Sequence, residues 1–552
     1  MTTLRSKGKL LLGTTLTASV LLTGCGSDTD LLPGATAPPP RAVNDSFDAL
    51  GNAVLFQAAS GVLANDAVNG AAISRFDPVG THGGTIALNP DGSFTYSPVF
   101  GFVGVETFTY TLTNLTGSSK ATVSLVSSAS GFFVDNTAAA GGNGSQTLPF
   151  NQLSDAIGAA NAGDTIFVSE GDGTSAGLAG AINLPAGVDL IGEGTGLVLS
   201  QTIVPQGDAP LLTGPITCGG SNTVSGLRIE GSASEGVIVN GVGDVTLSNN
   251  TIGNPALEHI SCEDITGTVT IDGNTLENPP NTSEDWIFIV NNDSNGAAII
   301  TDNIFTNEPG NDVASCMVIG TEGSSVMDVT VTGNRAEGTV ADAFGTCVYI
   351  AATDTSQQTV TVSDNSFSNL DGTGIGLLSE AAATLDGTVS GNSVSSASVA
   401  GVILNLAGSG GLITVNENII DSAREGLAVN NILSDGHTYV IANNRVTNSV
   451  DNAIRVVTTG DSKVAVRDNT LTDSGISSLD VGVGNANLCL EVTGNSVNDD
   501  MLFTTTDAGA TIELENGEAG LETVNTFAPG TVPVFFNLGT LTNRPPGYCN
   551  IP

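Results

Sequence analysis

The chain has 552 residues, which is long enough for more than one hydrophobic core. Lysine and arginine together number 14 against 56 aspartate and glutamate residues, so the net charge is −42. Such an acidic surface repels nucleic acid, and we expect no nucleic-acid partner. Seventy glycines with only 5% aromatic residues are typical of tight turns between short strands and argue against a helical globule.

Residues 1–25 predict an export signal. Basic residues within the first nine positions precede an apolar stretch that ends at Leu22 and is too short for a committed transmembrane helix. The phrase LTGC, which ends at Cys25, resembles the lipobox of bacterial lipoproteins, and this implies that Cys25 is acylated. The resemblance implies a membrane partner through that anchor, at the outer membrane or cell surface of a Gram-negative bacterium. An ordinary secretory leader is the alternative, and residues 26–40 then read as a Pro-rich tether.

Residues 41–128 predict a separate β-sandwich module. Short runs of alternating apolar and polar residues are separated there by turn residues such as Pro90-Asp91-Gly92. The expected strands are 54–57, 85–88, 93–96, 107–112 and 121–126. The phrases GVLANDAVNG from Gly61 and GFVGVETFTYTLT from Gly101 resemble the cadherin-like and immunoglobulin-like (Ig-like) repeats of bacterial surface proteins.

Acidic turns of this module are candidate calcium ligands. The resemblance implies that short acidic turns bind calcium, for which oxygen donors near strand ends are suitable. The candidate ligands are Asp45, Asn65, Asp66 and Glu106. Asn-Asp pairs also form turns without any ligand, so a purely structural role stays open. Calcium is the only cofactor that the sequence suggests.

A regular series of asparagines dominates the second half of the chain. Successive members are 24 to 31 residues apart, a period that indicates a solenoid. Each closes a phrase such as VTVSDNSF from Val360, in which apolar residues alternate with Thr or Ser as in a strand with one buried face. Stacked strands place each side-chain amide over the next, so the amides form a structural ladder. The ladder residues are Asn250, Asn274, Asn303, Asn334, Asn365, Asn392, Asn418, Asn444, Asn469 and Asn495.

This pattern resembles the right-handed parallel β-helix of the pectate-lyase-like superfamily, over residues 131–520. The expected fold class is therefore all-β, a right-handed parallel β-helix solenoid preceded by the small β-sandwich. Residues 150–162 predict a short helix that caps the first coil, since Leu153, Ala156, Ile157 and Ala160 share one face. We expect residues 521–552 to form a tail that caps the last coil.

Six cysteines remain after Cys25, an even number that indicates disulfides in an exported chain. Cys316 and Cys347 each precede a ladder asparagine by 18 residues (334 − 316 and 365 − 347), so they occupy equal positions on adjacent coils and are expected to pair. Cys489 in the last coil is expected to pair with Cys549 in the tail. Cys218 and Cys262 are then paired by elimination.

The sequence holds no obvious catalytic constellation. Hydrolases of this fold carry clustered aspartates with Gly-His-Gly and Arg-x-Lys motifs, which are absent, whereas a lyase needs a basic residue to remove the proton next to a uronate carboxylate. Four basic residues within three coils are the weak candidates for such a base: Arg445, Arg455, Lys463 and Arg467. Interleaved carboxylates favour the interpretation that these are surface ion pairs.

Aligning the strand before each ladder phrase reveals one outward-facing residue at the same position of each coil: Val318, Tyr349, Gly376, Ile403, Ala428 and Arg455. Such a row marks either a binding strip or a surface beneath a loop or the N-terminal module.

The sequence leaves three candidate functions. The first is a cell-surface lipoprotein whose β-helix presents a binding or adhesive face for carbohydrate. The second is a polysaccharide lyase acting on an acidic glycan, and the third is a structural spacer of a surface layer.

Overall fold

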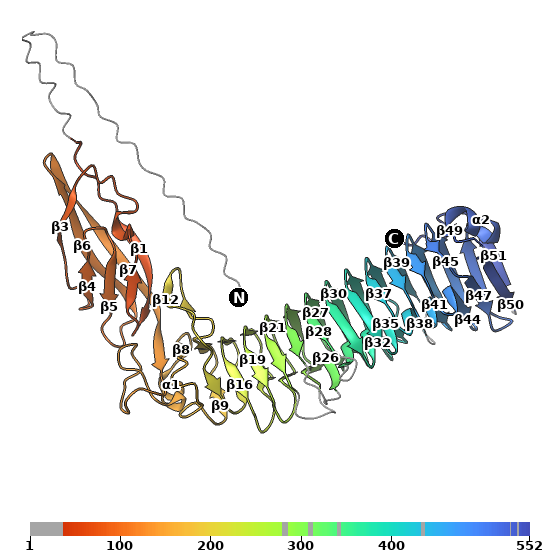
Figure 1. Ribbon diagram of the computed structural model, residues 1–552, viewed down its shortest axis with the longest axis horizontal. Helices are drawn as coiled ribbons and strands as arrows, with labels where there is room; N and C mark the ends of the chain where they lie inside the picture. Colours follow the sequence, from red (N-terminus) through yellow and green to blue (C-terminus); the bar gives the residue numbers. More distant parts are fainter. Residues whose placement is uncertain are drawn as a thin grey trace, which may run out of the picture.

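The computed structural model describes residues 37–278, 285–306, 313–338, 344–431, 436–529, 531–537 and 540–552. The leader, Cys25 and most of the tether therefore lie outside the described residues. The chain is an N-terminal β-sandwich followed by a long rod of stacked coils (Figure 1). None of the helices in the described part is long and apolar enough to cross a membrane.

Two sheets form the N-terminal module, as the alternating pattern predicted. In the first sheet β1 pairs with β7 in parallel, β6 pairs with β7 antiparallel, and β3 pairs with β6. Its strands are β1 (Asp45–Gly51), β3 (Ala72–Phe76), β6 (Gly104–Asn114) and β7 (Gly117–Val134). The second sheet consists of β2 (Leu55–Gln57), β5 (Phe94–Ser97) and β4 (Thr85–Leu88). A short 3-10 turn, η1 (Gly61–Leu63), lies between β2 and β3.

Strand β7 joins the module to the rod without an intervening linker. It pairs with β1 up to Ser130, and its last residues, from Gly131, pair with β8 (Thr165–Val168) of the first coil. Phe133 and Phe167 belong to the same buried cluster as the core of the sandwich, with ring centroids 5.8 Å apart. Helix α1 (Leu153–Ala159) covers the first coil and buries Leu153. The two domains thus share both a strand and a core.

Each coil of the rod contributes up to three strands, which stack on their equivalents in neighbouring coils to give three columns. About 13 turns are stacked in this way. Column 1 consists of β8, β10 (Asp189–Gly192), β15 (Thr223–Ser225), β18 (Val245–Ser248), β21 (Thr268–Asp272), β24 (Gly296–Thr301), β27 (Val326–Thr332), β30 (Gln357–Ser363), β33 (Thr384–Ser390), β36 (Leu412–Asn416), β39 (His437–Ala442), β42 (Ser462–Arg467), β45 (Asn487–Thr493), β48 (Thr511–Glu515) and β51 (Thr540–Arg544).

The other two columns follow the ladder asparagines. Column 2 holds short strands: β13 (Leu211–Leu212), β16 (Arg228–Glu230), β19 (Thr251–Gly253), β22 (Thr275–Glu277), β25 (Ile304–Thr306), β28 (Arg335–Glu337), β31 (Ser366–Leu370), β34 (Ser393–Ala397), β37 (Ile419–Asp421), β40 (Arg445–Thr447), β43 (Thr470–Thr472), β46 (Ser496–Val497) and β49 (Thr526–Phe527). Column 3 holds β9 (Ile182–Leu184), β14 (Ile216–Cys218), β17 (Val237–Asn240), β20 (Ile260–Glu263), β23 (Ile287–Asn292), β26 (Val313–Glu322), β29 (Phe344–Ala352), β32 (Thr373–Ser379), β35 (Ala400–Leu406), β38 (Glu425–Asn431), β41 (Asn452–Thr458), β44 (Ser477–Val483), β47 (Met501–Thr505) and β50 (Pro533–Asn537). A hairpin of β11 (Leu197–Val198) and β12 (Thr202–Val204) leaves an early coil and packs on the sandwich core.

The asparagine ladder turns the chain from column 1 to column 2. The residue before each of the ten predicted ladder asparagines has a positive φ, as at Asp364 (56°) and Gly391 (66°), a conformation that glycine, aspartate and asparagine tolerate best. Asn365 is 1% exposed, and its amide donates to the Oδ1 of Asn392, 2.9 Å away. An eleventh member, Asn525, extends the ladder beyond Asn495, whose amide donates to it at 2.9 Å. Inter-coil amide contacts therefore fix the register along the rod.

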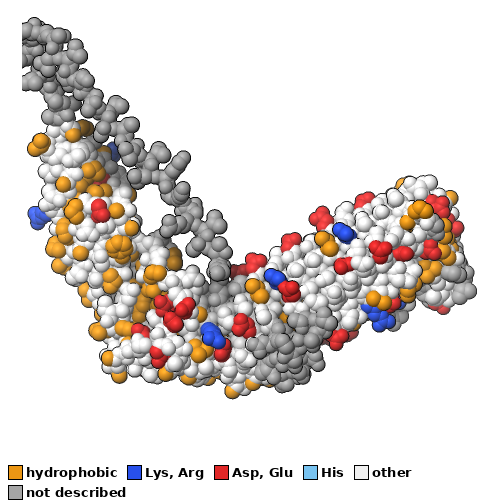
Figure 2. Space-filling view, in the orientation of Figure 1, with side chains coloured by type: hydrophobic (Ala, Val, Ile, Leu, Met, Phe, Trp, Pro, Cys, Tyr) orange, Lys and Arg blue, Asp and Glu red, His pale blue; other side chains and the backbone are white. Residues whose placement is uncertain are grey.

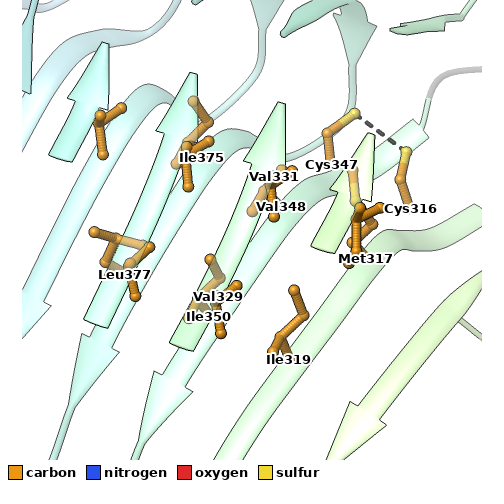
Figure 3. Close-up of a cluster of buried hydrophobic side chains, with 14 of the residues drawn as sticks. Cys316, Met317, Ile319, Val329, Val331, Cys347, Val348, Ile350, Ile375 and Leu377 are labelled. Atoms are coloured by element: carbon orange, nitrogen blue, oxygen red, sulfur yellow. Dashed lines mark hydrogen bonds between the residues drawn. The ribbon is translucent and has the colours of Figure 1, made fainter. Parts of the chain in front are cut away.

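Aliphatic side chains of all three columns fill the interior as one continuous cluster. Figure 3 shows part of it, where Val329 and Val331 of β27 face Val348 and Ile350 of β29. In the view of Figure 2 uncharged side chains cover most of the surface, and acidic side chains are scattered along the coils with only a few basic ones between them.

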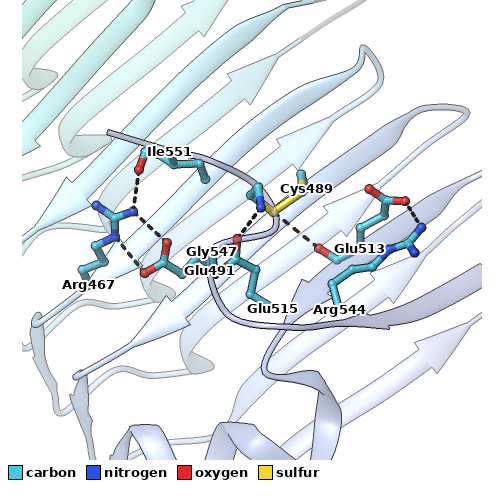
Figure 4. The surroundings of a disulfide bond; sticks show 9 residues. Arg467, Cys489, Glu491, Glu513, Glu515, Arg544, Gly547 and Ile551 are labelled. Atoms are coloured by element: carbon cyan, nitrogen blue, oxygen red, sulfur yellow. Dashed lines mark hydrogen bonds and ion pairs between the residues drawn. A yellow bond between two sulfur atoms is a disulfide. The ribbon is translucent and has the colours of Figure 1, made fainter.

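The C-terminal end differs from the prediction. Coil structure continues beyond residue 520 to Arg544, with helix α2 (Gly517–Val524) burying Leu521 in the core. The remaining residues run back over the outer face of column 1 instead of lying across the open end (Figure 4). The Cys489–Cys549 disulfide and Arg467 hold this path, because the disulfide joins the tail to β45 and the Arg467 guanidinium donates to the carbonyl oxygens of Ile551 (3.1 Å) and Pro552 (2.7 Å).

Candidate functional site

The outer face of column 3 carries the row of residues that the alignment predicted. Val318 pairs with Tyr349, Tyr349 with Gly376, and the series continues through Ile403, Ala428 and Arg455, so the alignment is confirmed. The register adds Phe288 before Val318 and Asp480 after Arg455. We call the row from Phe288 to Arg455 the outer strip. Its larger side chains are half-buried, whereas Gly376 and Ala428 are buried. Residues 279–284, 307–312 and 339–343, which precede β23, β26 and β29 in the sequence, lie outside the described residues.

Gly376 makes a notch in the middle of the outer strip. A methyl group placed on its Cα would lie 3.5 Å from Cδ2 of Tyr349 and 3.6 Å from Cγ2 of Ile403. The notch is therefore about as wide as one such group, with an aromatic ring on one side and an aliphatic side chain on the other. Burial, with the negative charge of Glu380, raises the pKa of Tyr349, so its hydroxyl stays protonated and can donate a hydrogen bond.

A chain of polar side chains follows the apolar part of the strip. The Asn430 amide donates to Oδ1 of Asn405 at 2.8 Å, and Arg455 donates to Oδ1 of Asn430 at 3.3 Å. Arg455 also lies 4.0 Å from Oδ2 of Asp480. Burial raises the pKa of Asp480 despite the opposing effect of Arg455. Column 3 thus presents apolar surface followed by amide, guanidinium and carboxyl groups on successive coils.

The structure does not bring the four candidate basic residues together. Arg445 is exposed on β40 of column 2, Arg455 lies on β41 of column 3, and Lys463 and Arg467 lie on β42 of column 1. Arg467 forms two hydrogen bonds with the Glu491 carboxylate, at 2.9 and 2.7 Å, in addition to those that hold the tail. Arg455 is the only one of the four on the outer strip.

Both buried histidines of the coils contact backbone groups and aromatic rings in the interior. His437 accepts a hydrogen bond from the Gly411 amide (3.2 Å), its Nε2 faces the Gly408 carbonyl oxygen (3.3 Å), and burial lowers its pKa. His259 stacks on Trp286 with centroids 4.7 Å apart, and burial lowers its pKa to about 4. Both rings are therefore neutral near pH 7 and face carbonyl oxygens in the interior.

One of the three predicted disulfides is present, between Cys489 and Cys549 (Figure 4). Cys316 and Cys347 occupy equivalent positions on β26 and β29, but they are separate thiols with Sγ atoms 3.2 Å apart (Figure 3). The predicted pairing of Cys218 with Cys262 is wrong. Val239 of the intervening coil pairs with both of them, so the two cysteines are two coil steps apart, or about 10 Å, beyond the reach of a disulfide.

Three of the four candidate calcium ligands lie together in the sandwich. The hydroxyl group of Tyr110 donates to Oδ2 of Asp66 (2.7 Å) and reaches Oδ2 of Asp45 (3.4 Å), with Asn65 beside them. Burial and the charge of Asp66 raise the pKa of Asp45 to about 6. Glu106 lies elsewhere, buried, where it accepts from the amides of the 82–84 turn. A protein hydroxyl thus occupies the space between the two carboxylates, and this arrangement does not fit a calcium ion. Among the described residues no group of three or more acidic, histidine or cysteine side chains is suited to hold a metal.

Sequence reasoning missed the polar end of the strip and the last ladder member. Extending the predicted row by one coil step would have reached Asp480, and the positions two residues after Ile403 and Ala428 are Asn405 and Asn430. Asn525 has the expected pattern of an apolar residue two positions later, but α2 replaces the strand phrase that precedes the other ladder residues.

Two family models agree with this architecture. Residues 37–126 match the family model described as a bacterial Ig domain, and residues 216–388 match the model of the right-handed β-helix region. Among solved structures, the A-module of a mannuronan C-5 epimerase from Azotobacter vinelandii is 12% identical, covering 71% of this chain and 93% of its own, with a TM-score of 0.24. A rhamnogalacturonan lyase is also 12% identical, covering 65% of this chain and 82% of its own, with a TM-score of 0.19. No curated protein sequence matches the chain. The N-terminal module therefore matches a bacterial Ig domain, and the rod is a parallel β-solenoid of which residues 216–388 match the right-handed β-helix model.

Proposed function

We propose that the protein is a lipid-anchored surface protein of the bacterial envelope whose outer strip binds carbohydrate without catalysis. The observation that carries the proposal is the composition of column 3, where an aromatic and aliphatic surface adjoins a hydrogen-bonded polar chain. Sugar rings present apolar faces and hydroxyl edges, so they bind where such surfaces meet amides and charged groups. A strip that runs across successive coils suits an extended polysaccharide more than a single sugar.

Tyr349 and Gly376 are the residues through which this proposal is tested. Tyr349 supplies a ring for stacking, and the notch at Gly376 leaves room beside it for part of a sugar. Replacing Gly376 by valine fills the notch without straining the backbone, because glycine has no positive φ there and β-branched residues suit strands. The Gly376→Val variant should therefore fold at least as well as the wild type and yet lose binding.

The experiment is retention of the full chain in gels that contain soluble polysaccharides, with alginate, polygalacturonate, xylan and dextran as the probes. Wild type should be retarded by at least one of them, and both Tyr349→Ala and Gly376→Val should migrate as in a plain gel. Ile419→Ala is the matched control, since Ile419 is an apolar residue 52% exposed on column 2. Retardation that survives both column-3 changes would refute the assignment to the outer strip.

The anchor is tested independently of the strip. Replacing Cys25 by serine removes the acylation site, so the protein should leave the membrane fraction, because stable attachment depends on the acyl chains. A Cys25→Ser protein that stays with membranes after a high-salt wash would contradict the lipoprotein assignment and leave carbohydrate binding to be judged by the gel experiment.

Arg455 supports a second candidate function, a polysaccharide lyase. It is a half-buried cation on the strip, and a lyase requires such a group beside a uronate. Incubation with alginate or polygalacturonate should then produce the ultraviolet absorbance of an unsaturated uronate, and Arg455→Gln should abolish it. Retention without that absorbance would favour the binding protein. The absence of both retention and absorbance would favour the structural spacer.

A further inference from the structure

The outer face of column 1 carries a regular array of hydroxyl groups that the proposed function does not use. Its first row passes from coil to coil through Thr330, Thr361, Thr388 and Thr414, which are direct partners in the strand register. The row extends in the other direction through Thr223, Thr246 and Thr270, with Ile299 as the single exception before Thr330. One position per coil over eight coils is therefore threonine in all but one case.

A second row runs parallel to the first, two residues further along each strand. It includes Thr301, Thr332, Ser363 and Ser390, again as direct partners. Valine, isoleucine or leucine stands between the rows, as at Val331 and Val362, and points into the core. Register shifts do not interrupt the pairings from β15 to β36, so the array is continuous.

The array is rigid and open to solvent. Threonine is β-branched, which restricts its side chain to few rotamers, so hydroxyl and methyl groups are held in fixed positions. Thr361 is exposed, and Thr330, Thr388 and Thr414 are half-buried between their neighbours. The C-terminal tail lies over later coils, where Arg467 holds it, beyond this array. Neither row contains a lysine or arginine, and Asp272 is the carboxylate within them.

The spacing of the array points to its ligand. Adjacent strands are about 4.8 Å apart, and residues two positions apart along a strand are separated by about 6.6 Å. Water oxygens that hydrogen-bond tetrahedrally at about 2.75 Å have second neighbours about 4.5 Å apart, and the resulting hexagonal lattice repeats about every 7.3 Å along its axis. The backbone spacing that carries the array agrees with the water lattice within about a tenth in both directions, by the same estimates.

We infer that the column-1 face binds ice. Hydroxyls of the first row would take the places of lattice waters, and the threonine methyl groups would occupy the gaps between them. In the second row Thr301 donates to Oδ1 of Asp272 (2.5 Å) and the Thr332 and Ser363 hydroxyls lie 3.0 Å apart, so this row presents hydrogen-bonded pairs beside the first. Each contact is weak, but the rigid face makes many at once without losing side-chain entropy. An array without basic residues, on a chain of net charge −42, fits an uncharged crystal better than an anionic polymer. The face is separate from the outer strip, so the inference does not depend on carbohydrate binding.

The test is partition of the full chain into slowly growing ice, together with thermal hysteresis. The array variant carries Thr361→Tyr and Thr388→Tyr, which project rings from the face while keeping residues that favour strands. Its matched control carries Ser366→Tyr and Ser393→Tyr, at exposed positions on column 2 of the same two coils. Circular dichroism and thermal melting establish that both variants are folded.

Wild type and the column-2 control should be incorporated into the growing ice and should lower the freezing point of the solution below its melting point. The array variant should lose both properties. Exclusion of the wild type from ice would overturn the inference, and so would an array variant that enters ice as well as the control. Binding to crystalline chitin or cellulose that the array changes abolish, without any effect on ice, would assign the face to a solid polysaccharide and equally overturn it. Tyr349→Ala should leave ice partition unchanged, which separates this inference from the proposed function.

Discussion

Replacing Asn365 by leucine removes one rung from the middle of the asparagine ladder. The Asn365 amide donates to the Val331 carbonyl and to Oδ1 of Asn392, both at 2.9 Å, and its own Oδ1 accepts from the backbone N–H (2.9 Å) and the side-chain amide (3.0 Å) of Asn334. Leucine has a similar volume but forms none of these four hydrogen bonds. At about 1 kcal/mol for each, the free energy of unfolding should fall by about 4 kcal/mol.

Urea unfolding followed by far-ultraviolet circular dichroism measures this loss. The fluorescence of Trp286, the single tryptophan, gives a second reading from a fully buried position within the coils. Ser366→Leu is the matched control, because it introduces the same side chain at the adjacent, exposed position and should change stability by no more than about 0.5 kcal/mol. Equal unfolding midpoints for the two variants would refute the claim that ladder amides hold the coils in register.

Three further predictions concern titration, the C-terminal tail and the cysteines. Because the pKa of Asp45 is raised to about 6, its contribution to the stability of the Ig domain is fully present below about pH 4 and is lost as the pH rises through 6; Asp45→Asn should therefore melt at a higher temperature than wild type at pH 8 but not at pH 4, and an equal difference at both would contradict the shift. Because the disulfide still holds Cys549, Arg467→Gln should expose only the residues after it, 550–552, to a carboxypeptidase, while Arg445→Gln should not, and equal resistance of these residues in both variants would show that the guanidinium contacts do not hold them. Refolding in a glutathione redox buffer should form a disulfide between Cys316 and Cys347, whose Sγ atoms lie 3.2 Å apart, and a non-reducing peptide map should show the two cross-linked peptides. Recovery of both cysteines as separate thiols would contradict this prediction.

The fold could be predicted from the sequence because a solenoid repeats its local rules. Once Asn365 and Asn392 are aligned, every strand position follows, including the outer row through Tyr349 and Gly376. The same alignment placed Cys316 and Cys347 on adjacent coils, since each has the same offset from its ladder asparagine. Periodicity thus supplied the register that is normally missing from a single sequence.

Features that interrupt the period could not be predicted. Cys218 and Cys262 were paired by elimination, without a register to show that a whole coil separates them. The last residues of the C-terminal tail contact Arg467, which is more than 80 residues away from them along the chain. The continuity of β7 depends on packing of Phe133 beneath the sandwich, a tertiary contact that leaves no periodic signal. Whether nearby carboxylates bind calcium depends on the position of one hydroxyl group, that of Tyr110.

Hydrogen exchange of the full chain, with and without a polysaccharide that retards it in gels, tests the central claim most directly. The binding account predicts slower exchange in the column-3 strands β29, β32, β35 and β38, with little change in the Ig domain or in column 1 of the same coils. Protection confined to the Ig domain or to column 1, with β32 unaffected, would contradict the assignment of the outer strip as the carbohydrate-binding face.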